Sequence, residues 1–252
     1  NKAHSLCLDL PEGNWQSIHF HGRHAMERQM ERCELIHGIE EFSSSRGTSS
    51  HQQNPTILLC EKECTETSGF CVGAALMYSG GFQTQIEKDQ LKHVRVVMGI
   101  NPETFSWKLN ASERFNTPEV ILSCSMEGTA KLSQQFHKII RHNVCRGKYQ
   151  LSQRPILINN WEATYFDFDE KKILDIAKEA SKIGIDMFVL DDGWFGKRDS
   201  DNSGLGDWYV NENKIKGGLA NLISKINDLG MKFGIWFEPE MVSEDSDLYR
   251  EH

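Results

Sequence analysis

The stretch Phe188-Val189-Leu190-Asp191-Asp192-Gly193-Trp194-Phe195-Gly196 is an apolar run that leads straight into two carboxylates and a loop rich in glycine and aromatic residues. That loop continues to Leu205-Gly206-Asp207-Trp208. A continuous apolar run is typical of a strand buried on both faces. Acids at the end of such a strand lie at the rim, where open α/β sheets and barrels carry their sites.

The flanking sequence predicts helices and further strands of the same kind. Apolar residues recur at helical spacing over 169–183 and 219–229, and Gly184 and Gly230 can end these two helices. A second buried strand is predicted over 232–237 and an earlier one over 155–161. Strands that alternate with helices predict a parallel sheet, open or closed.

The two glycine turns also suggest an alignment of the units. Gly184 and Gly230 are 46 residues apart (230 minus 184). With that offset, Asp192 and Glu238 would occupy equivalent positions at the rim.

The first half of the chain has a different pattern. Residues 1 to about 125 contain short apolar runs split by turn residues, which predicts a sandwich of antiparallel strands, with Gly80-Gly81 as a hairpin turn. A helical pattern follows over 128–142, with Leu132 and Phe136 on one side. We therefore expect an N-terminal β-sandwich domain with a linker helix over residues 1–150, and a unit of parallel strands and helices over 151–252.

Composition excludes several classes of partner. The net charge of −8 and the isoelectric point near 5.7 argue against nucleic acids and anionic membranes. No apolar run approaches the ~20 residues that a membrane span needs. Seven cysteines without paired spacing favour reduced, partly buried thiols in an intracellular protein. Cys60 and Cys64 have no second pair at zinc-finger spacing, so no metal is expected there.

Two polar segments of the first half have both an ordinary and a functional interpretation. His19, His21 and His24 cluster, and the first two share one face of a strand, but no acidic or cysteine partner follows at ligand spacing, so a polar strand face is favoured over a metal site. The loop from Arg46 to Pro55 is unusually polar and is interpreted as a solvated turn. The alternative is a loop that contacts a sugar or a neighbouring subunit.

Tryptophans and carboxylates gather in the second half, which favours a carbohydrate site. Indole rings pack against the C–H face of a pyranose, and carboxylates accept hydrogen bonds from its hydroxyls. Each tryptophan could equally cap the sheet. The residues concerned are Trp161, Trp194, Trp208 and Trp236 with Asp191, Asp192 and Asp207.

The residues alone name no nucleophile. Glycoside hydrolysis uses two carboxylates, ~5–5.5 Å apart for retention and ~6.5–9.5 Å for inversion. Asp191 and Asp192 are adjacent strand residues that point to opposite sides, so they suit two hydroxyls of one sugar better than catalysis at one bond. Glu238 and Glu240 are alternative acids, but they could equally hold their loop.

Several long motifs resemble the α-galactosidases of glycoside hydrolase family 36. The resemblance covers nearly the whole chain and includes the β-supersandwich domain of that family. The motifs are Asn159-Asn160-Trp161-Glu162-Ala163-Thr164-Tyr165-Phe166, Leu190 to Asp199, Leu205 to Trp208, Trp236 to Val242, Arg46 to Pro55, Tyr78-Ser79-Gly80, Met98 to Pro102, Phe105-Ser106-Trp107 and Cys145-Arg146-Gly147.

The resemblance implies a β-supersandwich domain followed by the N-terminal portion of a (β/α)8 TIM barrel. It further implies a retaining exo-α-galactosidase that removes terminal galactose from melibiose, raffinose and similar sugars, without a metal or organic cofactor. Asp191 and Asp192 would bind the 4- and 6-hydroxyls of galactose, and Trp161 and Trp236 would line the pocket. Cytoplasmic location and a homo-oligomer, a tetramer in the full-length protein, are expected.

The motifs that carry the family's nucleophile and acid/base are absent from this sequence. We therefore expect an internal fragment with no catalytic residue of its own, inactive and barely able to fold alone. The alternatives are a raffinose-type galactosyltransferase, an α-N-acetylgalactosaminidase and a non-catalytic galactose-binding protein.

Overall fold

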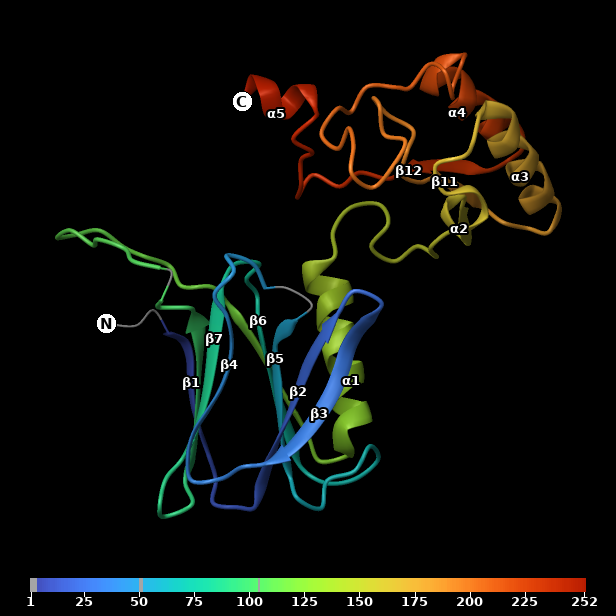
Figure 1. The fold of residues 1–252 in the computed structure, drawn as a ribbon. Helices are drawn as coiled ribbons and strands as arrows, with labels where there is room; N and C mark the ends of the chain where they lie inside the picture. The colour runs from blue at the N-terminus through green and yellow to red at the C-terminus, as the bar shows by residue number, and fades with distance from the viewer. Residues whose placement is uncertain (1–3, 50–51, 104) are drawn as a thin grey trace. The chain divides into compact units, whose positions relative to one another are not determined.

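The structure is a computed structural model that describes residues 4–49, 52–103 and 105–252. The chain divides into two compact units, 1–150 and 151–252 (Figure 1). The predicted antiparallel sandwich and the parallel strands that begin a barrel are both observed, in that order. None of the helices in the described part of the chain is long and apolar enough to span a membrane.

The first unit consists of two antiparallel sheets and one long helix. Its four-stranded sheet has the order β1-β8-β7-β4 and its five-stranded sheet the order β3-β2-β5-β6-β9. The strands are β1 (His4–Leu10), β2 (Trp15–Arg23), β3 (Met26–Glu34), β4 (Gly38–Ser44), β5 (Gln53–Glu61), β6 (Cys71–Leu76), β7 (Phe82–Lys88), β8 (Val94–Ile100) and β9 (Val120–Ser125).

The sandwich core forms because alternate residues of both sheets turn inward. Ile57 and Leu76 of the five-stranded sheet pack in one buried cluster with Phe82, Val96 and other residues of the four-stranded sheet. Each sheet therefore supplies half of the core.

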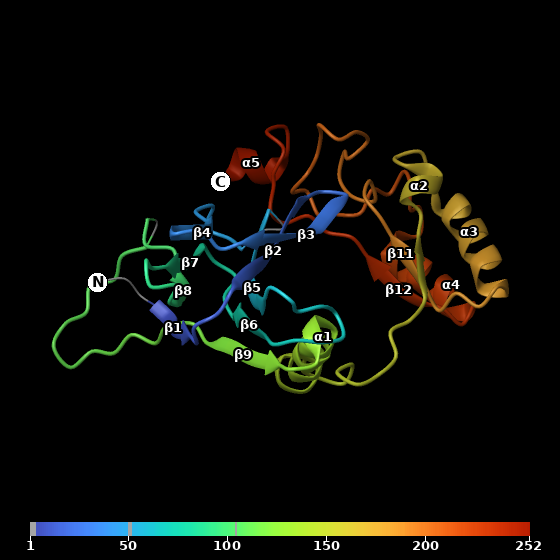
Figure 2. The ribbon, with the colours of Figure 1, turned by 90° about the horizontal axis from the view of Figure 1, so that it is seen from below.

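Helix α1 (Gly128–Ile139) covers the outer face of the five-stranded sheet and continues into a π-helical turn, η1 (Ile140–Val144). Figure 2 shows the helix beside β6 and β9. Leu132 and Phe136 are buried against the sheet, as their spacing predicts. Helix α1 can lie close to the sheet because Gly73 of β6 has no side chain beneath Phe136.

The prediction of a hairpin at Gly80-Gly81 is wrong. β6 pairs with β5 and β9, whereas β7 pairs with β4 and β8, so the segment between them crosses from one sheet to the other. The two glycines favour a turn, but the packing of the core determines which strands pair with β6 and β7. Leu76 and Phe82 on either side of the turn enter the same cluster from opposite sheets.

The polar segment from Arg46 to Pro55 is only partly a loop. Ser50 and His51 lie outside the described residues, and β5 already begins at Gln53. The preceding turn is held by Ser44, whose hydroxyl donates to Thr48 O at 2.6 Å. A bond from Ser49 N to Ser79 O at 2.8 Å holds it too.

All seven cysteines are free, and three of them (Cys60, Cys64 and Cys71) are buried, so the cysteines are partly buried as the sequence predicts. Burial raises the pKa of the Cys60 and Cys71 thiols. They therefore stay protonated near neutral pH, as inert parts of the interface with α1.

The second unit is a three-stranded parallel sheet with helices between the strands. The sheet order is β10-β11-β12, and α3 and α4 connect successive strands. The elements are β10 (Leu157–Asn159), α2 (Trp161–Thr164), α3 (Glu170–Lys182), β11 (Met187–Leu190), α4 (Gly218–Asp228), β12 (Lys232–Ile235) and α5 (Asp247–Glu251).

Local signals account for the helix limits. The side chain of Asp169 accepts a bond from Lys172 N at 2.8 Å and so caps α3. Gly184, with φ of 86°, ends the turn after it. Ile173 and Ala177 of α3 and Leu222 and Ile226 of α4 are buried against Phe188 and Leu190 of β11.

Two predicted details of this unit are wrong. Strand β10 ends at Asn159, and Trp161 begins the short helix α2 instead of continuing the strand. In the sheet Met187 lies beside Lys232, an offset of 45 residues (232 minus 187), so the glycine-based offset of 46 does not hold and Asp192 does not align with Glu238. A shift of one residue reverses which face a strand side chain occupies.

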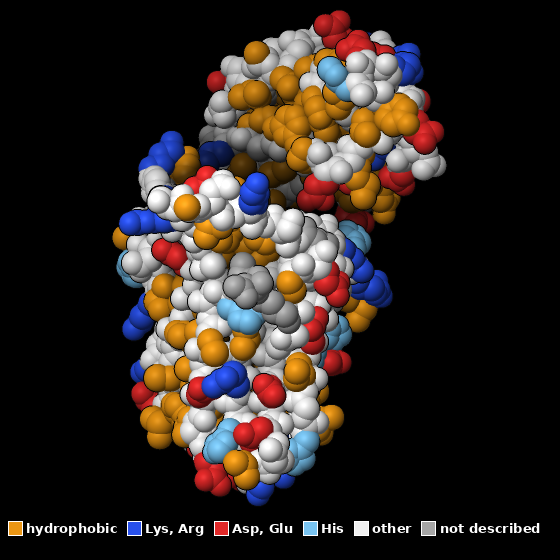
Figure 3. All heavy atoms as spheres, turned by 90° about the vertical axis from the view of Figure 1, so that its left-hand side faces the viewer, with side chains coloured by type: hydrophobic (Ala, Val, Ile, Leu, Met, Phe, Trp, Pro, Cys, Tyr) orange, Lys and Arg blue, Asp and Glu red, His pale blue; other side chains and the backbone are white. Residues whose placement is uncertain are grey.

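Hydrophobic side chains gather on one face of the second unit (Figure 3). In residues 237–249 the large exposed ones are Phe237, Met241, Val242, Leu248 and Tyr249. An exposed apolar surface of this kind is typical of a region that contacts other protein.

The close packing of α1 on the sheet gives a testable prediction. In Gly73→Ala the new Cβ would lie 2.6 Å from Phe136 Cε2, so the free energy of unfolding should fall by about 1–3 kcal/mol in urea denaturation. Adding Phe136→Leu makes room for the methyl group, so the double variant should lose less than the sum of the single losses. Strictly additive losses would contradict this packing.

Candidate functional site

The carboxyl ends of the three parallel strands are joined by one side-chain and one backbone hydrogen bond. Asn160, just after β10, accepts a bond from Asp191 N at its side-chain oxygen (2.9 Å). Trp236, just after β12, donates its N–H to Leu190 O at 2.9 Å. The parallel register thus brings Asn160, Asp191 and Trp236 to one edge of the sheet.

Asp192 is a buried carboxylate paired with Arg198. Arg198 Nε lies 3.0 Å from Oδ1, and Nη2 lies 2.9 Å from Oδ2. Both side chains are almost completely buried, with 8% of Asp192 and 5% of Arg198 exposed. Oδ1 also accepts Gly193 N at 2.6 Å, so few acceptor positions of this carboxylate stay open.

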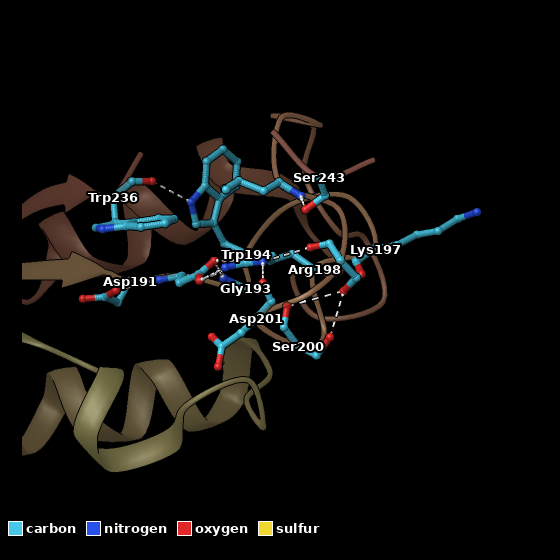
Figure 4. A network of polar contacts seen from close by, with 12 residues as sticks. Asp191, Gly193, Trp194, Lys197, Arg198, Ser200, Asp201, Trp236 and Ser243 are labelled. Atoms are coloured by element: carbon cyan, nitrogen blue, oxygen red, sulfur yellow. Dashed lines mark hydrogen bonds and ion pairs between the residues drawn. The ribbon is translucent and has the colours of Figure 1, made fainter. Parts of the chain in front are cut away.

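Arg198 also holds the rest of its loop. Its Nη1 donates to Asp201 O at 2.8 Å and to Ser203 O at 3.1 Å (Figure 4). Gly193, with φ of 89°, makes the turn that starts the loop, and a Cβ there would lie 2.9 Å from Phe166. One guanidinium group therefore shapes residues 192–203.

Asp191 is left in a different state from its neighbour. It is half-buried, and its Oδ1 accepts Asp192 N at 2.8 Å. None of the described residues donates a hydrogen bond to its Oδ2. Figure 4 shows Asp191 and Trp236 on the same side of the Arg198 network.

Burial raises the pKa of the Asp191 carboxyl, and the negative charge of Asp192 adds to the rise, while the bond from Asp192 N opposes it. No cation of the described residues pairs with Asp191. The site therefore presents one carboxylate without a counter-ion beside one that is fully paired.

Lys214 forms a second anchor beneath the loop. Its Nζ donates to Phe166 O and Gly193 O, both at 3.0 Å, and lies 2.9 Å from an oxygen of Asp199. The ammonium group also lies 5.0 Å from the centre of the Phe168 ring. This lysine connects the segment after α2 to the loop after β11.

The four tryptophans have different environments. Trp194 is 2% exposed, and its Nε1 donates to Trp236 O at 3.0 Å, so it belongs to the core and cannot stack on a sugar. Trp208 also packs against the core cluster. Trp161 and Trp236 are half-buried, at the starts of the segments that follow β10 and β12.

Asp207, the third acid of the predicted cluster, has a structural function. Its Oδ1 accepts Asp247 N at 2.9 Å and Leu248 N at 3.2 Å, at the first turn of α5. The side chain is therefore occupied as a helix cap. Asp207 therefore differs from Asp191, because both of its oxygens already accept backbone amides of α5.

Sequence reasoning missed three residues of this site: Asn160, Arg198 and Lys214. Asn160 and Arg198 stand inside motifs of the sequence, but their partners lie 31 and 6 residues away. Lys214 has no local signal at all.

A groove of about 350 Å³, lined by Glu170, Leu174, Lys178, Lys225 and others, lies along α3 and α4 and contains none of the predicted sugar-binding residues.

The two adjacent aspartates should respond oppositely to substitution. Asp192→Asn breaks a buried ion pair and should lower the free energy of unfolding by about 3–5 kcal/mol. Asp191→Asn should be neutral or stabilising at pH 7, because it removes a desolvated charge and keeps the oxygen that accepts Asp192 N.

The pH dependence supplies the control for this pair. The folded-state pKa of Asp191 is raised, so its charge penalises folding above that pKa and costs nothing below the unfolded value of about 3.9. Any advantage of Asp191→Asn should therefore disappear in urea unfolding at low pH. Equal destabilisation by the two variants at pH 7 would contradict the division between them.

Removing the second anchor should loosen the loop. Lys214→Met leaves backbone carbonyls of Phe166 and Gly193 without a donor and should cost about 1–3 kcal/mol of unfolding free energy. Hydrogen exchange at residues 193–199 should accelerate in this variant. Lys216→Met, at an exposed lysine two residues on, is the matched control and should leave both measurements unchanged.

Comparison with known proteins identifies the family. A family model described as "Melibiase" matches residues 114–252, and one described as "Glycosyl hydrolase family 36 N-terminal domain" matches residues 1–110. The chain is 57% identical to the bifunctional alpha-galactosidase/sucrose kinase AgaSK of Mediterraneibacter gnavus and 49% identical to the alpha-galactosidase AgaA of Geobacillus stearothermophilus, over 251 residues in each case.

Solved structures agree with these matches. The crystal structure of AgaA from Geobacillus stearothermophilus superimposes with a TM-score of 0.93 over 98% of this chain, and the galactosidase domain of AgaSK with 0.92. The chain spans 27% of the length of the AgaSK sequence and 34% of that of AgaA. From its motifs, its two units and these matches, the chain belongs to the melibiase family and carries a glycosyl hydrolase family 36 N-terminal domain ahead of its melibiase region.

Proposed function

We propose that the protein containing this chain is a retaining exo-α-galactosidase, acting on terminal α-linked galactose of oligosaccharides such as melibiose and raffinose. The named relatives are alpha-galactosidases, and variants of the Geobacillus AgaA have been crystallised with raffinose and with stachyose. Within this chain, Asp191, Asp192, Trp161 and Trp236 form one side of the galactose pocket.

The observation that carries the proposal is the state of Asp191. It is a half-buried carboxylate with an open oxygen, held by Asn160 and lying on the same side of the loop network as Trp236. A galactose hydroxyl can donate to that oxygen while the indole packs against the C–H face of the ring. Partial exclusion of water strengthens such a bond.

Asp192 has a smaller direct part in this proposal. Arg198 and Gly193 N already occupy most of its acceptor positions, which leaves room for at most one sugar hydroxyl. Its main task is to hold Asp191 and the following loop in position. Trp161, at the start of α2, closes the pocket from the neighbouring strand.

The chemical step requires two further carboxylates. Retention proceeds by double displacement, with one acid as nucleophile and another as acid and base, ~5–5.5 Å apart. We assign neither task to Asp191 or Asp192, because Asp192 is paired with Arg198 and Asp191 is the proposed acceptor for a galactose hydroxyl. We place the catalytic pair outside this chain, and the reaction needs no metal or organic cofactor.

Three further features belong to the proposal, and the first of them rests on the family resemblance alone. They are assembly of the whole protein as a homotetramer, a cytoplasmic location, and the absence of nucleic acid and membrane partners. The free thiols and the net charge of −8 support the last two.

The experiment is a kinetic assay of the whole protein on 4-nitrophenyl α-galactoside. Asp191→Asn should lower kcat/KM by about 10- to 100-fold, the cost of losing a charge-assisted hydrogen bond, while the protein stays folded. KM should rise as the pH falls through the raised pKa of Asp191, because protonation removes the charge that strengthens the bond from the sugar hydroxyl.

Asp201→Asn is the matched control, since that exposed side chain lies in the same loop and only its backbone oxygen binds Arg198. It should keep full activity. A folded Asp191→Asn variant with wild-type kcat/KM would overturn the pocket assignment. A folded, complete protein that is inactive on α-galactosides would overturn the proposed reaction itself.

A further inference from the structure

The hairpin of β2 and β3 brings two histidines, a carboxylate and a thiol to one face. In the antiparallel register His19 lies opposite Glu31, and Cys33 lies one step along the same face. His19 Nε2 lies 3.1 Å from Glu31 Oε2, and His21 Nε2 lies 3.2 Å from Oε1. The carboxylate is therefore held between two imidazoles.

This arrangement corrects the expectation that the histidines have no acidic or cysteine partner. The partners come from the neighbouring strand, so their spacing in the sequence gives no metal-ligand signal. His24, by contrast, lies in the turn between the two strands and is not part of the group.

We propose that His19, Glu31 and Cys33 bind a divalent cation of the zinc class at this edge of the sheet. One ligand atom from each residue lies within 4.8 Å of the other two, so small side-chain movements bring all three to coordination distance. His21 Nε2, on the other carboxylate oxygen, or a water molecule completes a four-coordinate shell.

The donor set selects the metal. One imidazole nitrogen, one carboxylate oxygen and one thiolate sulfur suit Zn²⁺, whereas Ca²⁺ and Mg²⁺ require oxygen ligands. The charges also balance, because one carboxylate and one thiolate neutralise a divalent cation. Binding releases the thiol proton of Cys33 to solvent and needs no electron transfer.

The ligands are positioned by the sandwich. The His19 side chain is 9% exposed, and its ring stacks on Phe42 with 4.2 Å between the ring centres. Glu31 and Cys33 are exposed on β3, which is the edge strand of its sheet (Figure 2), so a cation can enter from solvent. One ligand is rigid and two are accessible.

Two of the three arginines of this hairpin, Arg28 and Arg32, lie on the other face, and the third, Arg23, binds His24 O and Met26 Sδ at the turn. Arg28 lies over the ring of Phe20, and Arg32 Nη1 donates to Cys64 O at 2.9 Å. Phe20 and Cys64 both pack in the cluster beneath α1, on the opposite side of the sheet from His19. Strand alternation thus separates these two guanidinium groups from the proposed cation.

The experiment measures Zn²⁺ binding to the whole protein after metal is removed with a chelator. Isothermal titration with ZnCl2 should give one site per chain, and Cys33→Ser and Glu31→Gln should each weaken it by at least about tenfold. Both positions are exposed, so the variants should fold normally. With CoCl2, a thiolate-to-cobalt charge-transfer band should appear and be lost in Cys33→Ser.

Cys124→Ser and His24→Gln are matched controls, at an exposed thiol of β9 and at the exposed turn histidine. They should bind Zn²⁺ like the unaltered protein. Absence of Zn²⁺ binding, or unchanged affinity in the double variant Cys33→Ser, Glu31→Gln, would overturn the proposal and leave a simple His–Glu–His hydrogen-bond network. Galactosidase activity is independent of either result.

Discussion

The buried ion pair between Asp192 and Arg198 is the interaction on which the site depends. Two charges removed from water are costly unless every donor and acceptor finds a partner. Here the guanidinium nitrogens reach both carboxylate oxygens and two backbone carbonyls of the same loop. The loop after β11 can therefore be long and irregular, and still hold one conformation.

That pairing explains why two adjacent, chemically identical side chains differ. Asp192 receives the compensating charge, whereas Asp191 receives backbone and amide contacts and no cation from any residue that the structure describes. The raised pKa of Asp191 reflects this lack of compensation. A carboxylate without a counter-ion can still bind a ligand. Its partial burial without a compensating charge destabilises the fold, and the well-packed core beneath it offsets that loss.

In the β2–β3 hairpin, too, positively charged and negatively charged side chains are kept apart, here by the alternation of side chains along the strands. Alternation along the strands sends Arg28 and Arg32 to the side of α1, and His19, Glu31 and Cys33 to the other side. A cluster that can bind a cation thus coexists with arginines on the same hairpin. In both units, where a charged side chain points matters more than how many charges the segment carries.

Local sequence patterns specify the elements: the apolar run ending at Leu190, the helix faces of α3 and α4, the glycine that ends α3, and the antiparallel sandwich. These follow from local periodicity and from turn chemistry, which act over a few residues. The tertiary structure decided what those elements meet. In the folded chain Arg198 pairs with Asp192, and Trp194 is buried in the core. Asp207 accepts backbone amides at the start of α5, and the Gly80-Gly81 turn connects strands of two different sheets. The tertiary structure also brought Glu31 and Cys33 to His19. Such contacts depend on strand register and on the balance of buried charge, which are properties of the packed chain and leave no trace in local spacing.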